Sequence, residues 1–166
     1  MSQPTGATYR RIKSLLRRQT TLVLATADQD AEPRSTPLFF IAGNDLRLYW
    51  FSSPASRHSR NCAGNSRASV AVFREARGWR QIRGVQMDGL VSIVADPDLR
   101  RELTRKYRAR FGLGGDFEAI IRRSALYSFT PARARYVDNS RKFANKIELR
   151  LPAGRASATA PVTGRQ

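Results

Sequence analysis

The sequence predicts a mainly β (α+β) protein, built as an antiparallel barrel with peripheral helices. Two observations lead to this fold class. Short apolar segments rich in β-forming residues follow one another with brief polar turns between them, as in sheets whose neighbouring strands run antiparallel. Helical periodicity is confined to the N-terminus, one short turn and one inserted region, so we expect the helices to surround the sheet.

The first fifty residues are predicted to form one helix and three strands. Four apolar residues recur at helical spacing with basic residues between them, namely Tyr9, Ile12, Leu15 and Leu16. Strands are then expected over 21–27, 34–41 and 46–51, separated by the turn segments DQDAEP and AGND. Because these connections are short, the three strands are predicted to form an antiparallel meander.

The middle of the chain is predicted to hold a short helix over about 56–65, a strand over 68–73 and a long strand within 83–94. Apolar and polar residues alternate along the long strand. One face would carry Val85, Met87, Val91 and Ile93, and the other Gly84, Gln86, Asp88 and Ser92. Gly89, in the middle of this strand, is expected to mark a bulge or a bend.

The last third is predicted to contain a helix pair and the closing strands. Pro97 suits a first helical turn, and an apolar residue recurs every four positions until the segment FGLGGD ends the helix near residue 111. FEAIIRR is expected to form a second helix, followed by strands over 126–138 and 146–151. We interpret the chain as a single domain over residues 1–151, followed by a disordered tail over 152–166.

Composition points to an anionic partner. Lys and Arg number 30 against 13 Asp and Glu, which gives a formal net charge of +17, and arginine forks bind phosphates and carboxylates with two hydrogen bonds. Nucleic acid, an acidic membrane surface and a phosphorylated cofactor all satisfy this charge. No segment approaches the roughly 18 apolar residues of a membrane helix, so we expect no membrane contact.

Cysteine and histidine occur once each, as Cys62 and His58. An intramolecular disulfide and a zinc cluster of these residue types are therefore excluded, and this usage is typical of a reducing cytoplasm. The two residues are spaced i, i+4 on the predicted helix and could form a thiolate–imidazolium pair. A buried, inert Cys62 is the alternative.

The segment FSSPASRHSRN, residues 51–61, has the features of a phosphate-binding turn. A helix N-terminus offers unpaired amides and a favourable dipole, and this one is preceded by the hydroxyls of Ser53 and Ser56 and carries Arg57 and His58. The alternative interpretation is an ordinary N-cap, in which a serine starts the helix and Arg57 is solvated.

The order of motifs around this turn resembles the FMN-binding split-barrel family typified by pyridoxamine 5′-phosphate oxidase. In that family an Arg and a small residue begin one strand, an aromatic and a hydroxyl residue end another, and a Ser-Arg-Lys turn, an NPRVSL segment and a strand with a late glycine follow. The matching elements here, within about residues 8–95, are Arg34-Ser35, Phe51-Ser52, Ser56-Arg57-His58, NSRASV and Gly89. The resemblance implies an antiparallel six-stranded split barrel that binds FMN at the subunit interface of a homodimer.

Carried over position by position, the resemblance implies a set of FMN contacts. The phosphate would be bound by Arg34 and Arg57, the isoalloxazine ring would lie beside Ser35, Thr36 and Pro37, and the ribityl chain or phosphate would be flanked by Phe51 and Ser52. Two departures from the family pattern affect this set. The turn lysine is His58 here, a weaker cation whose charge near neutral pH depends on its environment, and the strand glutamine falls at Gly84, with Gln86 as its displaced substitute.

The ending RYVDNSRKFANKIELRL lacks the substrate motif of true pyridoxamine-phosphate oxidases and resembles an uncharacterised branch of the family. This similarity makes four residues candidates for a wall of the active site, namely Asp138, Asn139, Phe143 and Lys146. A turn followed by a strand edge is the equal alternative.

The leading hypothesis is an FMN-dependent oxidoreductase acting on a small organic substrate, with no catalytic residue identified and no metal expected. One alternative is a split barrel that binds a deazaflavin or heme. Another is a nucleic-acid-binding barrel that uses the positive charge and stacks bases on Trp50 or Trp79, although no nucleic-acid-binding motif accompanies these residues.

Overall fold

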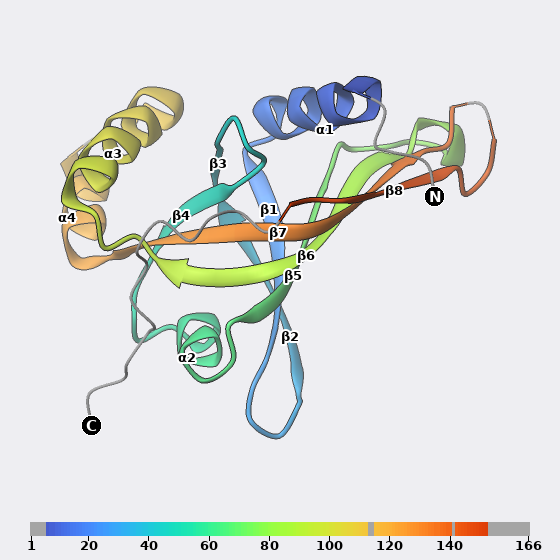
Figure 1. Ribbon diagram of the computed structural model, residues 1–166. Helices are drawn as coiled ribbons and strands as arrows, with labels where there is room; N and C mark the ends of the chain where they lie inside the picture. Colours follow the sequence, from blue (N-terminus) through green and yellow to red (C-terminus); the bar gives the residue numbers. More distant parts are fainter. Residues whose placement is uncertain (1–5, 113–114, 141, 153–166) are drawn as a thin grey trace.

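The computed structural model describes residues 6–112, 115–140 and 142–152, whose strands form one antiparallel sheet curled into a half-barrel (Figure 1). The helices are α1 (Gly6–Arg18), α2 (Arg57–Gly64), α3 (Pro97–Phe111) and α4 (Gly115–Arg123), with a 3₁₀ turn η1 (Trp79–Gln81). The strands are β1 (Thr21–Ala27), β2 (Pro33–Phe39), β3 (Ile41–Ala42), β4 (Leu48–Ser52), β5 (Arg67–Phe73), β6 (Arg83–Ile93), β7 (Ala125–Asp138) and β8 (Lys146–Arg150). The predicted α+β split barrel is confirmed.

The strand count corrects the prediction, because the described residues contain eight strands rather than six. Two strands are small additions to the barrel. β3 has only two residues and pairs with β4, and β8 pairs with the second half of β7 beside the main path of the sheet.

The order of strands in the sheet is β2-β1-β5-β6-β7-β4-β3. The chain leaves β2 at Phe39 and, after the buried residue Phe40, enters β3 at the other end of this order. The prediction of one strand over 34–41 is therefore wrong, because β2 pairs with β1 whereas β3 pairs with β4. The predicted three-strand meander is wrong for the same reason. β2 and β4 contact each other without pairing, and this is where the barrel is split.

β4 connects two apolar cores because both of its faces are covered. Leu48 and Trp50 point into the half-barrel, where they belong to a buried cluster with residues of α1, α2 and five further strands. Tyr49 and Phe51 point the other way, into a smaller core formed with α3 and α4. Every residue of β4 is buried for this reason. Trp50, 1% exposed and stacked on Tyr127, is not available to stack on a base or a flavin.

The predicted irregularity at Gly89 is confirmed. The β6–β7 register shifts between Asp88 and Gly89, so that Ala132 is the extra residue on β7. A Cβ at Gly89 would lie 2.2 Å from the carbonyl oxygen of Thr130, which leaves no space for any side chain there. The bulge increases the local twist of the sheet, as barrel curvature requires.

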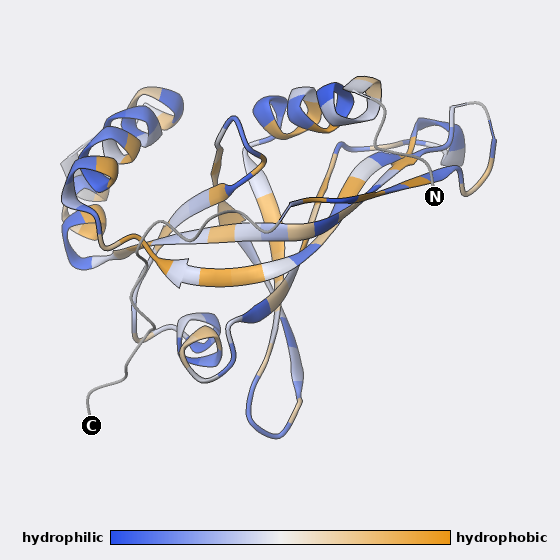
Figure 2. Cartoon of the chain, in the orientation of Figure 1, coloured by the Kyte–Doolittle hydropathy of each residue, from blue (hydrophilic) through white to orange (hydrophobic). Residues whose placement is uncertain are grey.

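The helices cover the ends and one side of the half-barrel (Figure 1). α1 buries Ile12 and Leu16 against the barrel core, as its periodicity predicted. α3 starts with Asp96 as N-cap and ends with Gly112 in the left-handed conformation, φ 58°. Hydrophilic residues dominate the surfaces of α1 and α3, while the centres of the strands are hydrophobic (Figure 2).

Among the described residues, no helix is long and apolar enough to cross a membrane. The same residues contain no group of three or more His, Cys, Asp or Glu side chains that could hold a metal ion. The predicted tail over 152–166 lies outside the described residues, except for Pro152.

Candidate functional site

The turn between β4 and α2 gathers hydroxyl groups around the single imidazole. The Oγ of Ser52, the last residue of β4, lies 2.7 Å from Nε2 of His58, and the Oγ of Ser56 lies 3.1 Å from the same nitrogen. Ser56 is the N-cap of α2 and accepts a hydrogen bond from the backbone N–H of Ser59. Ser56 therefore caps the helix, and Arg57 beside it is exposed to solvent.

Burial lowers the pKa of His58 below its ordinary value of 6.5. The imidazole is therefore uncharged at neutral pH and its Nε2 is engaged by serine hydroxyls. The family that the sequence resembles has a lysine at this position, whereas this turn has a neutral hydrogen-bonding group. The positive charge of the turn therefore comes from arginine.

Cys62 is buried on α2, and burial raises the pKa of its thiol to about 11. The thiol stays protonated near neutral pH, and the imidazole four residues earlier bonds to Ser52 and Ser56. The thiolate–imidazolium hypothesis is therefore wrong, because neither partner carries the required charge.

Arg34 lies on the side of β2 that faces α2. It stands opposite Thr26 in the β1–β2 register, and Thr26 accepts a hydrogen bond from Asn61 of α2 at 3.2 Å. The Arg34 guanidinium pairs with Glu32, but its Nε is buried and has no hydrogen-bond partner among the described residues. A buried donor without an acceptor is costly, so this atom marks a place where an anion would be stabilising.

β2 is an edge strand, since within the described residues it pairs only with β1. Backbone groups on its second edge are therefore open to a ligand lying in the split. The side chains of β2 alternate: Arg34 and Thr36 are half-buried on the inner side, while Ser35 and Pro37 are exposed on the outer side. The predicted site residues of this strand thus divide between two faces.

Phe51 does not face the split. Its ring packs edge-on against Tyr107 at 5.2 Å and lies under the guanidinium of Arg100, in the core beneath α3. The exposed side chain of Ser53 accepts a hydrogen bond from the backbone N–H of Ala55 within the turn. The side chains that the fold brings together at the start of α2 are therefore those of Ser52, Ser56, His58 and Ser59.

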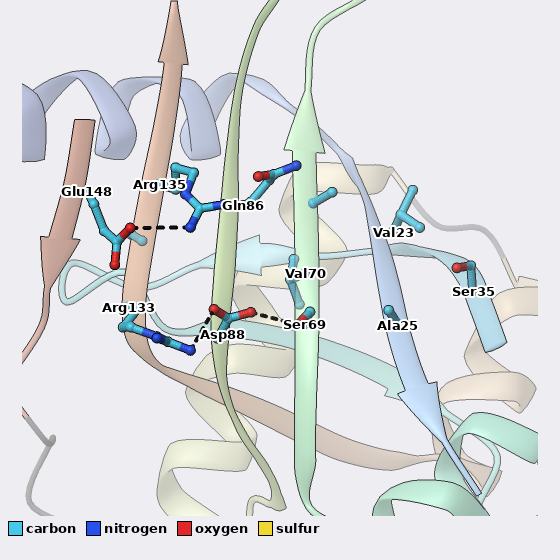
Figure 3. Close-up of a pocket in the computed structure, with 12 residues that line it drawn as sticks. Val23, Ala25, Ser35, Ser69, Val70, Gln86, Asp88, Arg133, Arg135 and Glu148 are labelled. Atoms are coloured by element: carbon cyan, nitrogen blue, oxygen red, sulfur yellow. Dashed lines mark hydrogen bonds and ion pairs between the residues drawn. The ribbon is translucent and has the colours of Figure 1, made fainter. Parts of the chain in front are cut away.

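A cavity of about 360 Å³ opens on the outer face of the sheet and contains two predicted residues, Ser35 and Gln86 (Figure 3). They come from different rows of aligned side chains that run across the strands. The first row is Pro37, Val23, Ala71, Gln86, Arg135 and Glu148, and the second is Ser35, Ala25, Ser69, Asp88, Arg133 and Arg150.

Charged groups in these rows pair across the strands, as Figure 3 shows. Asp88 accepts a hydrogen bond from the Ser69 hydroxyl at 2.7 Å and forms an ion pair with Arg133 at 3.3 Å. Arg135 pairs with Glu148 at 3.3 Å. Sequence reasoning missed these residues, although the alternation of ARAR before the last turn signalled that two arginines share one face.

Asn139 and Lys146 lie at the far end of β7, away from the turn. β7 begins opposite Ser52 and ends opposite Arg83, and its 14 residues span roughly 45 Å at about 3.3 Å per residue. The Asn139 side chain is 4% exposed, and its Oδ1 has no partner among the described residues. Within one chain these candidates therefore do not share a site with Ser52 and His58.

Aromatic and charged residues surround this far end. Phe143, 67% exposed, packs edge-on against Trp79 at 5.7 Å, and Arg80 lies over the Trp79 ring. Asp138 bonds to Arg83 at 3.0 Å. Although burial raises the pKa of the Asp138 carboxyl, hydrogen bonds from Ser140 and Arg83 hold it below its ordinary value.

Comparison with known proteins identifies relatives of the whole fold. The family described as pyridoxamine 5′-phosphate oxidase matches residues 10–138. No curated protein sequence matches the chain significantly. Three solved structures illustrate the fold, and each is less than 25% identical to this chain.

A putative pyridoxamine 5′-phosphate oxidase from Listeria innocua is 18% identical, covers 80% of this chain and 99% of its own length, and has a TM-score of 0.65. The heme storage protein HutZ from Vibrio cholerae is 21% identical, with coverage of 74% and 88% and a TM-score of 0.63. A heme binding protein from Mycobacterium smegmatis is 15% identical, with coverage of 90% and 60% and a TM-score of 0.69.

Proposed function

The chain belongs to the pyridoxamine 5′-phosphate oxidase family, and from this membership we propose that it is a cytoplasmic FMN-binding oxidoreductase acting on a small organic substrate. Two observations carry the proposal together: the buried Nε of Arg34, which has no partner among the described residues and lies on the side of β2 that faces α2, and the open edge of β2. A ligand that carries an anionic group and a flat polar ring suits both features, because the anionic group would accept a hydrogen bond from Arg34 and the ring would pair with the open edge of β2.

Different residues of the proposed site bind different parts of FMN. Arg34 and Arg57 hold the FMN phosphate, and the Ser52 hydroxyl contributes a further hydrogen bond. The backbone of residues 35–37 hydrogen-bonds to the polar edge of the ring, as an edge strand can. FMN supplies the two-electron chemistry when bound, and the chain positions the ring and sets the charge around it.

A second copy of the chain completes the site in this proposal. Asn139 and Lys146 lie too far along β7 to reach the FMN of their own chain. A homodimer with a twofold axis brings the far end of one β7 to the turn of the other chain, so that the partner supplies the active-site wall.

Titration with FMN and with riboflavin, followed by the flavin absorption spectrum, tests the proposal. We expect saturable FMN binding and weaker binding of riboflavin, which lacks the phosphate. Arg57→Ala should weaken FMN binding about tenfold or more, the effect of losing one charge-assisted hydrogen bond, while leaving riboflavin unchanged.

Arg122→Ala is the matched control, since it removes an equal charge at the exposed end of α4. Equal losses in Arg57→Ala and Arg122→Ala would indicate general charge attraction. Wild-type protein that ignores FMN would overturn the proposal.

Heme is the second candidate ligand, favoured by one observation: the only imidazole of the chain is half-buried and uncharged, as iron ligation requires. Adding hemin to the protein tests this candidate. An imidazole-ligated heme would give an absorption spectrum that shifts in His58→Ala, whereas FMN binding by the same variant should weaken only slightly.

A further inference from the structure

A larger cavity, of about 930 Å³, adjoins the first on the outer face of the sheet and is lined by residues of β1, β2, β5, β6, β7 and β8. The two cavities share Ala25, Ser69, Asp88 and Arg133. Three arginines line it, namely Arg67, Arg133 and Arg150. Apolar groups complete its walls, among them Leu90, which is 52% exposed. Its volume lies in the range typical of small-molecule sites, about 300–1,000 Å³. We call it the arginine groove.

The positive charges of the arginine groove are incompletely balanced. Arg133 and Arg150 stand directly opposite each other in the β7–β8 register, an arrangement that like charges make unfavourable. The one carboxylate that lines the groove is Asp88, which is already shared between Arg133 and Ser69. Glu148, the nearest acid on β8, is taken by Arg135.

Arg67 and Arg150 have no ion-pair partner within the described residues. Three guanidinium groups therefore face a single carboxylate across a groove with apolar walls, and an external anion would relieve their repulsion.

We propose that the arginine groove binds the phosphate groups of a nucleotide-sized organic anion. Planar guanidinium forks recognise phosphate oxygens with paired hydrogen bonds, and three of them suit a ligand with at least two negative charges. Leu90 and the other apolar walls suit an organic body rather than a bare ion. The inference does not require FMN binding, because these arginines are separate from Arg34 and Arg57.

The groove reaches the base of β2, where Pro33 lines it next to Arg34. A ligand there would lie beside the proposed flavin site, as a phosphorylated co-substrate of an oxidoreductase must. This placement is the only part of the inference that rests on the proposed function.

Calorimetric titration of the full chain with inorganic pyrophosphate, ADP and adenosine tests the proposal. We expect one saturable site per chain for pyrophosphate, tighter binding of ADP because its base and ribose contact the apolar walls, and no measurable binding of adenosine. The double variant Arg133→Gln/Arg150→Gln should weaken pyrophosphate binding at least tenfold. Both residues are exposed, so the variant keeps its fold.

The double variant Arg122→Gln/Arg123→Gln is the matched control, because it removes the same charge from the exposed end of α4. It should leave pyrophosphate binding unchanged. Asp88→Asn should strengthen binding several-fold, because it removes the carboxylate that competes for Arg133.

Three outcomes would overturn the proposal. The first is wild-type protein that does not bind pyrophosphate, and the second is an equal loss in both double variants, which would indicate general charge attraction. The third is FMN that displaces pyrophosphate and binds more weakly to Arg133→Gln/Arg150→Gln, which would assign these arginines to the flavin phosphate. Failure of wild-type protein to bind FMN would contradict the proposed function and leave the arginine groove standing.

Discussion

His58 is the residue whose chemical state decides most about the turn at residues 51–61. A lysine there would carry a permanent charge toward a bound phosphate, whereas the half-buried imidazole is neutral and hydrogen-bonded to Ser52 and Ser56. The phosphate attraction of this turn therefore depends on arginines at neutral pH. Because His58 becomes protonated in acid, its hydrogen bonds in the turn depend on pH.

We expect the free energy of unfolding to fall with decreasing pH in wild-type protein more steeply than in His58→Gln. Burial lowers the pKa of folded His58, so the unfolded chain takes up a proton first, near pH 6.5, and is stabilised as the pH falls further. Denaturant unfolding of both proteins between pH 8 and pH 5 measures the difference, which should be constant above about pH 7.5 and change below it. Parallel curves throughout would contradict the prediction.

Strand pairing determines which side chains meet at the scale of elements. The β6–β7 bulge at Gly89 bends the sheet, and the β7–β8 register sets Arg133 against Arg150. Arg135 and Glu148 meet one step further along the same two strands. Adjacent rows of one strand pair thus hold a repulsive and an attractive contact.

Gly89→Ala should destabilise the fold by about 1–3 kcal/mol, because its Cβ would lie 2.2 Å from the Thr130 carbonyl oxygen and 2.9 Å from the Phe129 ring. Gly78→Ala is the matched control, since a Cβ there meets nothing within 4 Å. It should change stability by less than about 0.5 kcal/mol. Urea denaturation of the two variants provides the measurement, and similar stabilities would show that β7 can move away from β6.

Arg150→Gln should stabilise the protein by about 0.2–1 kcal/mol, because it removes a like charge opposite Arg133. Glu148→Gln, two residues away, should have the opposite sign because it removes the acid paired with Arg135. A melting temperature that rises by up to about 4 °C in the first variant and falls slightly in the second is the expected result. A decrease in both would indicate that Arg150 has a stabilising contact.

The two groups of predicted site residues lie at opposite ends of the molecule. The turn with Ser52 and His58 lies at the start of β7, whereas Asn139 follows the last residue of β7 and Lys146 pairs with Val137 beside that end. Both groups can act in one site only if two chains combine. The oligomeric state is therefore the whole-molecule property that decides the proposed function.

Light scattering should give a mass twice the 18.7 kDa of one chain. If each site combines Arg57 of one chain with Lys146 of the other, a homodimer of Arg57→Ala chains has two impaired sites, and so does a homodimer of Lys146→Ala chains. A mixed dimer of the two variants has one site with both substitutions and one intact site. We therefore expect the mixed dimer, isolated from both homodimers by a different affinity tag on each chain, to bind FMN at half the wild-type stoichiometry, with wild-type affinity. A monomeric protein, or a mixed dimer no better than its parents, would contradict a shared site.

The sequence by itself determined the properties that depend on neighbours along the chain. Periodicity located β1, β6, α1 and α3, because solvent exposure alternates with the geometry of each element. Ser56 starts α2 as N-cap, and Gly89 marks the register shift, since caps and bulges follow from local backbone requirements.

Only the tertiary structure decided which strands pair and which faces meet. On either side of Phe40 the chain pairs with different strands, because β2 pairs with β1 and β3 pairs with β4. This pairing and the number of strands depend on contacts between residues far apart in sequence, about which local patterns carry no information. The arginine groove arises in the same way, because the register across the four strands from β5 to β8 brings Arg67, Arg133 and Arg150 to one cavity. Local pattern fixes how a strand presents its side chains, whereas long-range pairing fixes what they face.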